Sequence, residues 1–399
     1  MNIELVRRIA FTIGALLIFR LGSHLPLTGI SIQSASFTSV SPRVSVFALN
    51  LFPYLSAALV IQLISMVWKR FGSLARDGEA GRRKIVRYTL VLTLLLATFQ
   101  AWGIASALQN ISGVVAEPGD WFLLSATVSM VGGVFFLVWL SDQITRYGVG
   151  NGIALLVMVP ILISFPPDAA KIIELMREGV ASANLTLFNA VFCVAVIALV
   201  VFVESARRNV PLEFAARQVG KRLLPPQSAV LPIKINSAGY LLPVTVAPWV
   251  IYAPFALAGL VVDSPAPWLA AAYRHALAPP IYLPVISVAM FVLAFIYTAY
   301  VVDPEQAAEK LAKRGGAIPG VEPGEPTADC LDRVVSFTTV LGAVYLVSLM
   351  IIPQVLVLYG KVFTSNISGG AALIVVCTVL DLKMQVRELS LTNSGGARQ

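Results

Sequence analysis

The stretch WFLLSATVSMVGGVFFLVWL at Trp121–Leu140 contains no charged side chain in twenty consecutive positions. At the helical rise of 1.5 Å per residue, twenty residues cover about 30 Å, which is the thickness of the hydrocarbon core of a bilayer. The stretch therefore predicts a helix that crosses a membrane.

Nine further stretches have a similar composition, and most are long enough to span a bilayer as helices. The whole chain is 57% hydrophobic and 13% charged, whereas soluble domains average about 45–50% apolar and 25% charged residues. The composition predicts an all-α membrane protein with ten transmembrane helices. The nine further stretches are Ile9–Leu25, Val44–Val67, Tyr88–Ala107, Gly152–Phe165, Leu185–Val203, Ala238–Val262, Ile281–Val302, Val334–Leu358 and Ile367–Leu382.

The basic residues alternate with these stretches. If the N-terminus lies inside, the inner segments hold 23 Lys and Arg residues and the outer segments five, while Arg20 lies within the first span. The positive-inside rule then predicts an N-in, C-in topology. The net charge of +8 does not indicate nucleic-acid binding, because such a protein gathers its basic residues on one face.

The ten spans divide into two halves of five. Because five is odd, the second half enters the membrane from the opposite side, so the two halves are inverted. We predict an N-terminal half at 1–165, an outer hinge loop at 166–187 and a C-terminal half at 188–399, with long inner loops at 204–237 and 303–333.

Irregular spans occur at matching positions of the two halves. The fifth span of each half, Gly152–Phe165 and Ile367–Leu382, is short, and the second is interrupted by proline, at Pro53 and at Pro243 with Pro248. Such pairs point to a central pathway in inverted-repeat membrane proteins. Prolines also occur in membrane helices that line no pathway.

An ion-coupled carrier normally keeps a charged group near mid-membrane. Arg20 lies within the first span but close to its outer end, and the acidic residues nearest the spans lie at their ends. This pattern argues against a coupled carrier. The acids are Asp142, Glu204, Asp303 and Asp381.

Catalytic chemistry is not indicated either. His24 and His275 fall in outer segments without a partner at ligand spacing, and the three cysteines, Cys193, Cys330 and Cys377, lack the spacing of a disulfide or a metal site. We predict no enzyme activity, no metal and no cofactor.

Six motifs occur in order along nearly the whole chain, and they resemble the corresponding segments of the SecY family, the channel subunits of the bacterial protein translocase. They are FPYLSAALVIQLI at Phe52–Ile64, DGEAGRRKIVRYT at Asp77–Thr89, WLSDQITRYGVGNGI at Trp139–Ile153, LPIKINSAG at Leu231–Gly239, DPEQAAEKLAKRGGAIPGVEPGEPTAD at Asp303–Asp329 and GGAALIVVCTVLD at Gly369–Asp381.

The resemblance implies a protein-conducting channel of the bacterial inner membrane. Such a channel passes unfolded secretory polypeptides across the bilayer and releases apolar segments sideways into it. A cytosolic motor ATPase or the ribosome supplies the energy. The alternative is an inverted-repeat carrier of small solutes.

The resemblance also implies an aliphatic constriction at mid-membrane. Such a ring offers a moving chain no polar group to bind, and it can dewet to block ions when empty. Val244 is the least secure member, because a shift of one residue beside Pro243 would replace it by Thr245. The six residues of the ring are Leu51, Leu55, Ile153, Val157, Val244 and Ile374.

Two amides lie inside apolar spans, at Gln62 and Gln100. An unpaired buried amide is costly, so they either pair with each other or line the side gate that the family has between helices. Gly148, Gly150 and Gly152 predict a tight turn, because a phosphate loop requires a preceding strand.

The resemblance implies several partners: the small membrane subunits SecE and SecG, the SecA motor ATPase, the ribosome, precursor polypeptides and the lipid bilayer. It implies no nucleic acid except through the ribosome. The inner loops are therefore expected to dock partners, although basic inner loops also fix topology alone. The predicted docking residues are Arg82, Arg83, Arg207, Arg208, Arg217, Lys221, Arg222, Glu322 and Gly324.

Two features depart from the family pattern. The segment Ser31–Ser45 is brief and rich in Ser, so the plug helix of the family is expected to be reduced or missing. Glu322 precedes Pro323-Gly324-Glu325 where the family usually has Arg, and a reversed charge at a docking surface is expected to change partner choice.

Overall fold

The computed structural model describes most of the chain. The predicted seventh span, Ala238–Val262, lies outside the described residues except for Gly239, as do Lys221 and nearly all of the Ser31–Ser45 segment. The described ranges are 3–30, 45–68, 78–109, 113–179, 182–214, 217–219, 222–224, 227–237, 279–360 and 369–395, with a few single positions between them.

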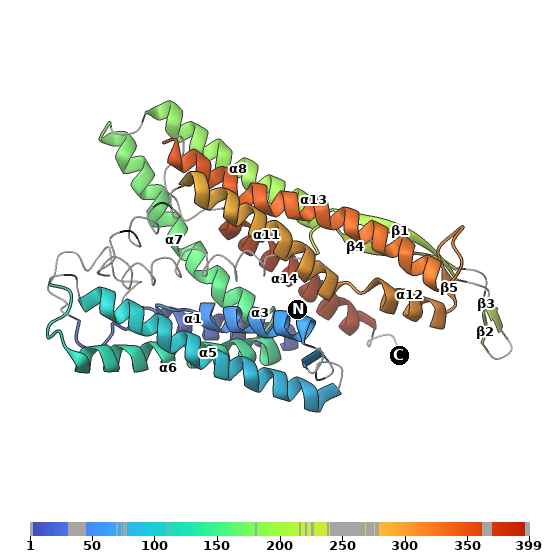
Figure 1. Cartoon of the computed structure of the whole chain (residues 1–399), viewed down its shortest axis with the longest axis horizontal. Coiled ribbons are helices and arrows are strands. Elements are labelled where there is room, and N and C mark those ends of the chain that lie inside the picture. The colour runs from blue at the N-terminus through green and yellow to red at the C-terminus, as the bar shows by residue number, and fades with distance from the viewer. Residues whose placement is uncertain are drawn as a thin grey trace. The chain divides into compact units, whose positions relative to one another are not determined.

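Nine of the ten predicted stretches coincide with helices in the described part of the chain (Figure 1). By length and composition, seven described helices can cross a membrane, and Phe52–Ser65 is a shorter apolar helix. The helices are α1 (Ile3–Gly22), α3 (Phe52–Val67), α5 (Gly78–Gln109), α6 (Asp120–Tyr147), α7 (Gly152–Arg177), α8 (Ala183–Ser205), α11 (Pro279–Val301), α12 (Pro304–Lys313), α13 (Glu325–Leu358) and α14 (Gly369–Gly395).

Helix α7 corrects the predicted loop at 166–187. It continues through Pro166 and Pro167 to Arg177, and α8 begins at Ala183. A proline in a helix interior removes one backbone hydrogen bond and can kink the helix without ending it, and the residues that follow the pair are mostly good helix formers. The prolines therefore do not end the helix.

The predicted short spans are corrected in the same way. Helix α7 has 26 residues and α14 has 27, so both helices are longer than the apolar stretches Gly152–Phe165 and Ile367–Leu382 that predicted them. The interruption of the second span is confirmed in the first half, because a turn occupies residues 46–51 and α3 begins only at Phe52, with Pro53 in its first turn. Pro243 and Pro248 of the second half lie outside the described residues.

The chain is mainly helical, as predicted, but its inner loops also form two small sheets that the sequence did not predict. A three-stranded antiparallel sheet has the order β4-β1-β5, and β2 pairs with β3. Along β1, Val210 and Leu212 are buried while their neighbours are exposed or partly exposed, which is the period-2 pattern of a strand. The strands are β1 (Arg207–Phe214), β2 (Arg217–Val219), β3 (Arg222–Leu224), β4 (Gln227–Lys234) and β5 (Gly316–Ala317).

The chain divides into two compact units. The first comprises Met1–Lys171, Val244–Leu277 and Ile374–Gln399, and the second comprises Ile172–Pro243 and Ala278–Leu373. Helices α7 and α14 each contribute residues to both units.

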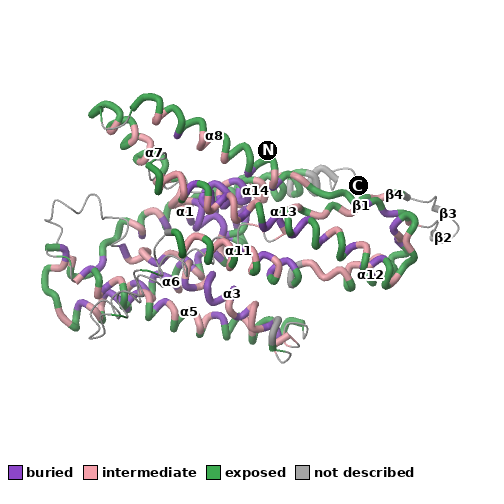
Figure 2. Tube along the Cα trace, turned by 45° about the horizontal axis from the view of Figure 1, so that its top comes forward, coloured by how far each residue is buried: buried purple, intermediate pink, exposed green. Residues whose placement is uncertain are grey.

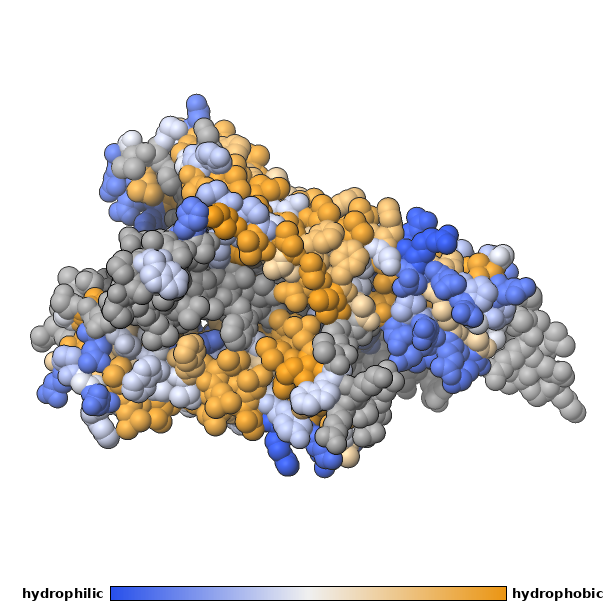
Figure 3. Space-filling view, viewed as in Figure 1, coloured by the Kyte–Doolittle hydropathy of each residue, from blue (hydrophilic) through white to orange (hydrophobic). Residues whose placement is uncertain are grey.

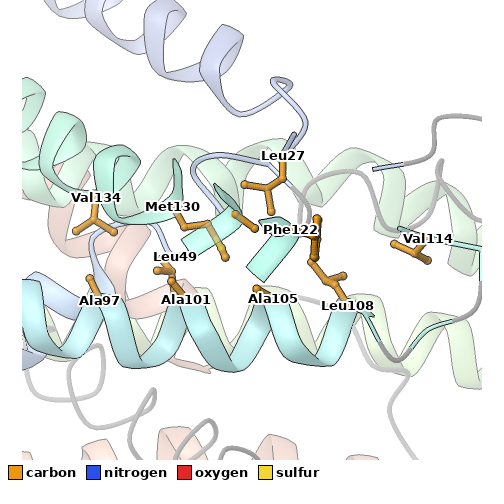
Figure 4. Packing of buried hydrophobic residues seen from close by; sticks show 11 residues of the cluster. Leu27, Leu49, Ala97, Ala101, Ala105, Leu108, Val114, Phe122, Met130 and Val134 are labelled. Carbon is orange, nitrogen blue, oxygen red and sulfur yellow. The ribbon is translucent and has the colours of Figure 1, made fainter. Parts of the chain in front are cut away.

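Helices α5 and α6 form the core of the first unit. Ala97, Ala101 and Ala105 follow one another at intervals of four along one face of α5, facing Met130 of α6 (Figure 4). All four side chains are buried. Small residues at a helix contact let two backbones approach closely, which is how helices associate in lipid.

The second unit combines apolar helices with a small hydrophobic core beneath the sheet, of the kind found in water-soluble proteins. Helix α13 packs against α11 and α12, and Val210, Leu212 and Leu331 are buried beneath the sheet. The surface is apolar over α8, α11 and α13 and hydrophilic near α12 (Figure 3). Helix α8 is exposed along most of its length (Figure 2), as expected for a helix that faces lipid.

Candidate functional site

Leu51 and Leu55 are placed by the turn that precedes α3. Asn50 has φ 48°, a left-handed conformation that Asn tolerates better than most residues. Its Oδ1 accepts a hydrogen bond from the Leu51 N–H at 2.8 Å. The Leu55 N–H then donates to the Leu51 carbonyl at 3.0 Å, so both side chains lie on one face of the helix start. Both are buried.

Aromatic packing holds this turn against α1 and α6. The ring of Phe47 stacks between those of Phe19 and Phe136, with centroid distances of 6.0 and 5.7 Å. A methyl group on Gly133 would overlap the carbonyl oxygen of Val46. The glycine therefore allows the turn to approach the backbone of α6.

The glycine-rich turn Gly148–Gly152 is confirmed as a turn, and it connects α6 to α7. The Val149 N–H donates to Thr12 Oγ1 of α1 at 2.9 Å, and the Gly150 N–H donates to Gln385 Oε1 of α14 at 2.8 Å. Two distant helices thus bind the backbone of the turn.

The end of the turn is bound by nearer groups. The Gly152 N–H donates to Thr145 Oγ1 at 2.9 Å, and the Ile153 N–H donates to Asn151 Oδ1 at 3.0 Å. These bonds pair backbone amides that the first turn of a helix leaves without intrahelical partners.

Glycine is required in this turn for two reasons. Gly150 has φ 95°, which side chains rarely adopt. A Cβ at Gly152 would overlap the Ser141 carbonyl of α6, and one at Gly148 would overlap Thr12 Oγ1. The beginning of the turn therefore packs directly on α1, and the start of α7 packs on α6.

The described ring residues on α7 and α14 are mostly buried. Val157 and Ile374 are 4% and 8% exposed, and Ile153 is half-buried. The Thr378 hydroxyl donates to the Ile374 carbonyl at 2.7 Å. Together with Leu51 and Leu55 they all belong to the first unit, whereas Val244 lies outside the described residues.

Gln62 of α3 and Gln100 of α5 are both half-buried, and α3 packs against α5. Within the described residues, the two side chains are not hydrogen-bonded to each other. The structure therefore does not support mutual pairing of these amides.

Four of the predicted basic residues, Arg82, Arg83, Arg207 and Arg208, are exposed. Arg207 and Arg208 begin β1, and Arg82 and Arg83 lie near the start of α5. Arg83 forms an exposed ion pair with Glu79 at 3.5 Å. Arg217 and Arg222 fall in β2 and β3.

Glu322 lies on the exposed surface just before α13. Its carbonyl accepts a hydrogen bond from the Thr327 hydroxyl at 2.8 Å. Gly324 caps α13 with φ 114°. The reversed charge therefore lies at the start of a helix and is accessible to a partner.

A model of the SecY family matches residues 45–383. The chain belongs to the SecY family. The protein translocase subunit SecY of Escherichia coli (strain K12) is 37% identical over 98% of this chain and 93% of its own length. The solved structure of a protein conducting channel superposes with a TM-score of 0.68 at 16% identity, covering 97% of this chain and 93% of that one. Sec61 in the canine ribosome-channel complex gives 0.64 at 15% identity, with coverages of 97% and 93%.

This membership identifies a protein-conducting channel and not an enzyme. The chain is a multi-pass protein of the bacterial inner membrane, with the helical fold of SecY channels. The alternative of a small-solute carrier is therefore excluded.

The sequence reasoning missed several contacts that position this SecY-family site. Thr12 and Gln385 bind the glycine turn from 137 and 235 residues away. In the second unit, the sequence reasoning also missed that Asn236 donates from Nδ2 to Glu204 Oε1 at 2.7 Å, with both side chains buried. The only sequence signal for Thr12 was a hydroxyl within an apolar stretch, and such a signal does not name a partner.

Proposed function

We propose that this channel conducts unfolded secretory polypeptides through a ring formed by Leu51, Leu55, Ile153, Val157, Val244 and Ile374. We also propose that it releases apolar segments sideways into the bilayer, with Gln62 and Gln100 along the side gate. The observation that carries the proposal is the family match over nearly the whole chain.

The geometry supports the ring in two ways. The described ring side chains are aliphatic and largely buried, so none offers a polar group to a passing chain. The segments that carry Leu51 and Ile153 begin at turns fixed by side-chain hydrogen bonds. Fixed turns keep apolar side chains in one place without help from charged groups.

The test is to stall a secretory precursor in membrane vesicles and crosslink it from single cysteines. We expect adducts from Leu55→Cys, Ile153→Cys and Ile374→Cys. Leu95→Cys is the matched control, because Leu95 is 62% exposed on α5 and is expected to face lipid. The absence of an adduct at all three ring positions would exclude this ring as the pore.

We propose ten transmembrane helices in two inverted halves, with the N- and C-termini inside. Nine predicted spans coincide with described helices, and the charge distribution supports the orientation. Accessibility of single cysteines at Lys171 and at Arg208 to an impermeant reagent tests this proposal. We expect labelling of the first from outside only and of the second from inside only.

We propose that the exposed basic residues of the inner segments dock a cytosolic motor ATPase such as SecA or the ribosome, and that SecE and SecG accompany the channel. The canine relative was solved in a ribosome-channel complex, and Arg207 and Arg208 are exposed. Exposed basic side chains suit an acidic or phosphate-rich partner.

Glu322→Arg tests whether the reversed charge sets partner choice. We expect the affinity for the motor to change severalfold in a direct binding measurement, because the substitution shifts the local charge by two units. Glu325→Gln is the control for a nearby exposed acid. An unchanged affinity in Glu322→Arg would show that the departure at this position is incidental.

A further inference from the structure

The glycine turn Gly148–Gly152 joins three helices that are far apart in sequence. Its amides are bound by Thr12 of α1 and Gln385 of α14, as well as by Thr145 of the preceding helix α6. All these residues belong to the first unit. The turn is therefore a junction within one compact unit and not only a connection from α6 to α7.

Helix α7, which begins at the end of the turn, and helix α14 carry residues of the proposed ring. Ile153 follows the turn directly on α7, and Ile374 lies on α14, the helix that also carries Gln385. A side chain at Gly150 would contact Leu382 of α14 at 2.7 Å. Helix α14 therefore both packs on the turn and hydrogen-bonds to it.

A hydrogen bond between two ring helices favours the arrangement in which it forms. If the ring widens to admit a polypeptide, α7 and α14 must change their relative position, and a bond present only in the resting arrangement opposes that change. Gln385 is exposed, so water can satisfy its amide once the helices separate. Such a bond can break and form again at each opening.

We propose that Gln385 is a positioning residue that latches α7 to α14 in the resting channel through the Gly150 amide. The proposal rests on the proposed ring. Gln385 does not contact the translocating chain; it biases the equilibrium between the closed and the open ring.

The experiment measures the resting ion conductance of the whole translocase in planar bilayers. In Gln385→Leu, which cannot accept the Gly150 N–H, we expect conductance to rise about fivefold, the factor that one net hydrogen bond contributes to an equilibrium. Gln385→Glu keeps an acceptor oxygen at the same position, and we expect it to retain the parental conductance. The control is Met384→Leu at the neighbouring exposed position.

A parental conductance in Gln385→Leu would overturn the latch, and so would an equal rise in Gln385→Glu. If Gln385→Leu does not accumulate as folded protein, Gln385→Asn makes the same test, because its shorter side chain withdraws the amide from Gly150. Precursor crosslinking from Ile153→Cys and Ile374→Cys in the parental channel separates the two proposals. Loss of those adducts would contradict the ring, whereas unchanged conductance with intact adducts would contradict the latch alone.

Discussion

Ala97, Ala101 and Ala105 fill the helix contact of the first unit, whereas Val210, Leu212 and Leu331 fill the core beneath the sheet of the second. Lipid tails are as apolar as side chains, so helices inside a membrane gain little from burying large residues and gain instead from close packing. Beneath the sheet, burial removes aliphatic surface from water, and large side chains contribute most. The two cores are therefore stabilised differently, the first by close packing of small residues and the second by burial of large aliphatic residues.

The largest effect is expected from Leu212→Ala. Removing a buried aliphatic side chain from a core of the kind found in water-soluble proteins costs about 3 kcal/mol, and Leu212 lies in the core that joins β1 to α13. We expect faster hydrogen exchange of the β1 and β4 amides and faster tryptic cleavage near Arg217. Val230→Ala, at an exposed position of β4, is the control. Equal exchange in both variants would show that the sheet does not depend on this core.

Ala101→Leu tests whether the helix contact of the first unit depends on close packing of small residues. Ala101 is fully buried between α5 and α6, and extra carbon atoms at a close helix contact cost about 2 kcal/mol through overpacking. We expect a lower unfolding free energy in a denaturing-detergent titration. Leu95→Ala removes a large side chain from an exposed position of the same helix, and we expect a change below about 0.5 kcal/mol. A larger loss in Leu95→Ala than in Ala101→Leu would refute the close-packing account.

Glu204→Leu tests the hydrogen bond that joins the apolar helix α8 to the sheet. Glu204 ends α8 and accepts a hydrogen bond from Asn236 after β4, and both side chains are buried. Loss of the acceptor leaves the Asn236 amide without this partner, at a cost of about 1.5 kcal/mol. Glu204→Gln keeps an acceptor oxygen and is expected to lose less. The measurement is hydrogen exchange of the β4 amides, and equal losses in both variants would argue against a role for this bond.

The smallest effect concerns the exposed ion pair of α12. Lys313 donates a hydrogen bond to Glu309 at 2.6 Å and lowers the pKa of that carboxyl from its ordinary 4.5. A lowered pKa in the folded state means that the contribution is present above the ordinary value and is lost as the pH falls through the folded pKa. We expect α12 to exchange slightly faster below pH 4.5, once intrinsic exchange rates are corrected for pH. In Glu309→Gln this pH dependence is expected to disappear; its persistence would assign it to another group.

The apolar helices were predictable from the sequence because uncharged stretches of twenty residues have few alternatives to a membrane span. The sheet was not, because only Val210 and Leu212 mark β1 as a half-buried strand among charged and proline residues. The continuation of α7 was missed because the predicted span ended with its apolar stretch at Phe165. In each missed case, the deciding contact lies outside the local sequence.

The candidate site, like the fold, was predictable only where the local sequence decides the structure. Gly148, Gly150 and Gly152 predicted a turn, since glycine has few other uses at such spacing. The partners Thr12 and Gln385 could not be predicted, because their hydrogen bonds join residues that only the fold brings together. The ring itself came from the family resemblance, since aliphatic side chains occupy every membrane helix.

The hairpin of β1 and β4 also has a mechanical consequence. Eight paired rows, from Arg207 with Lys234 to Phe214 with Gln227, make a stiff rod that is about 27 Å long at 3.4 Å per residue. The rod is attached at both ends: Asn236 binds Glu204 of α8 at one end, and β5 pairs with Glu213 and Phe214 at the other. Between these ends, Val210 and Leu212 share a buried core with Leu331 of α13. A force that a partner applies to β2 and β3 is therefore passed to α13 along the length of the rod, and to α8 through Asn236.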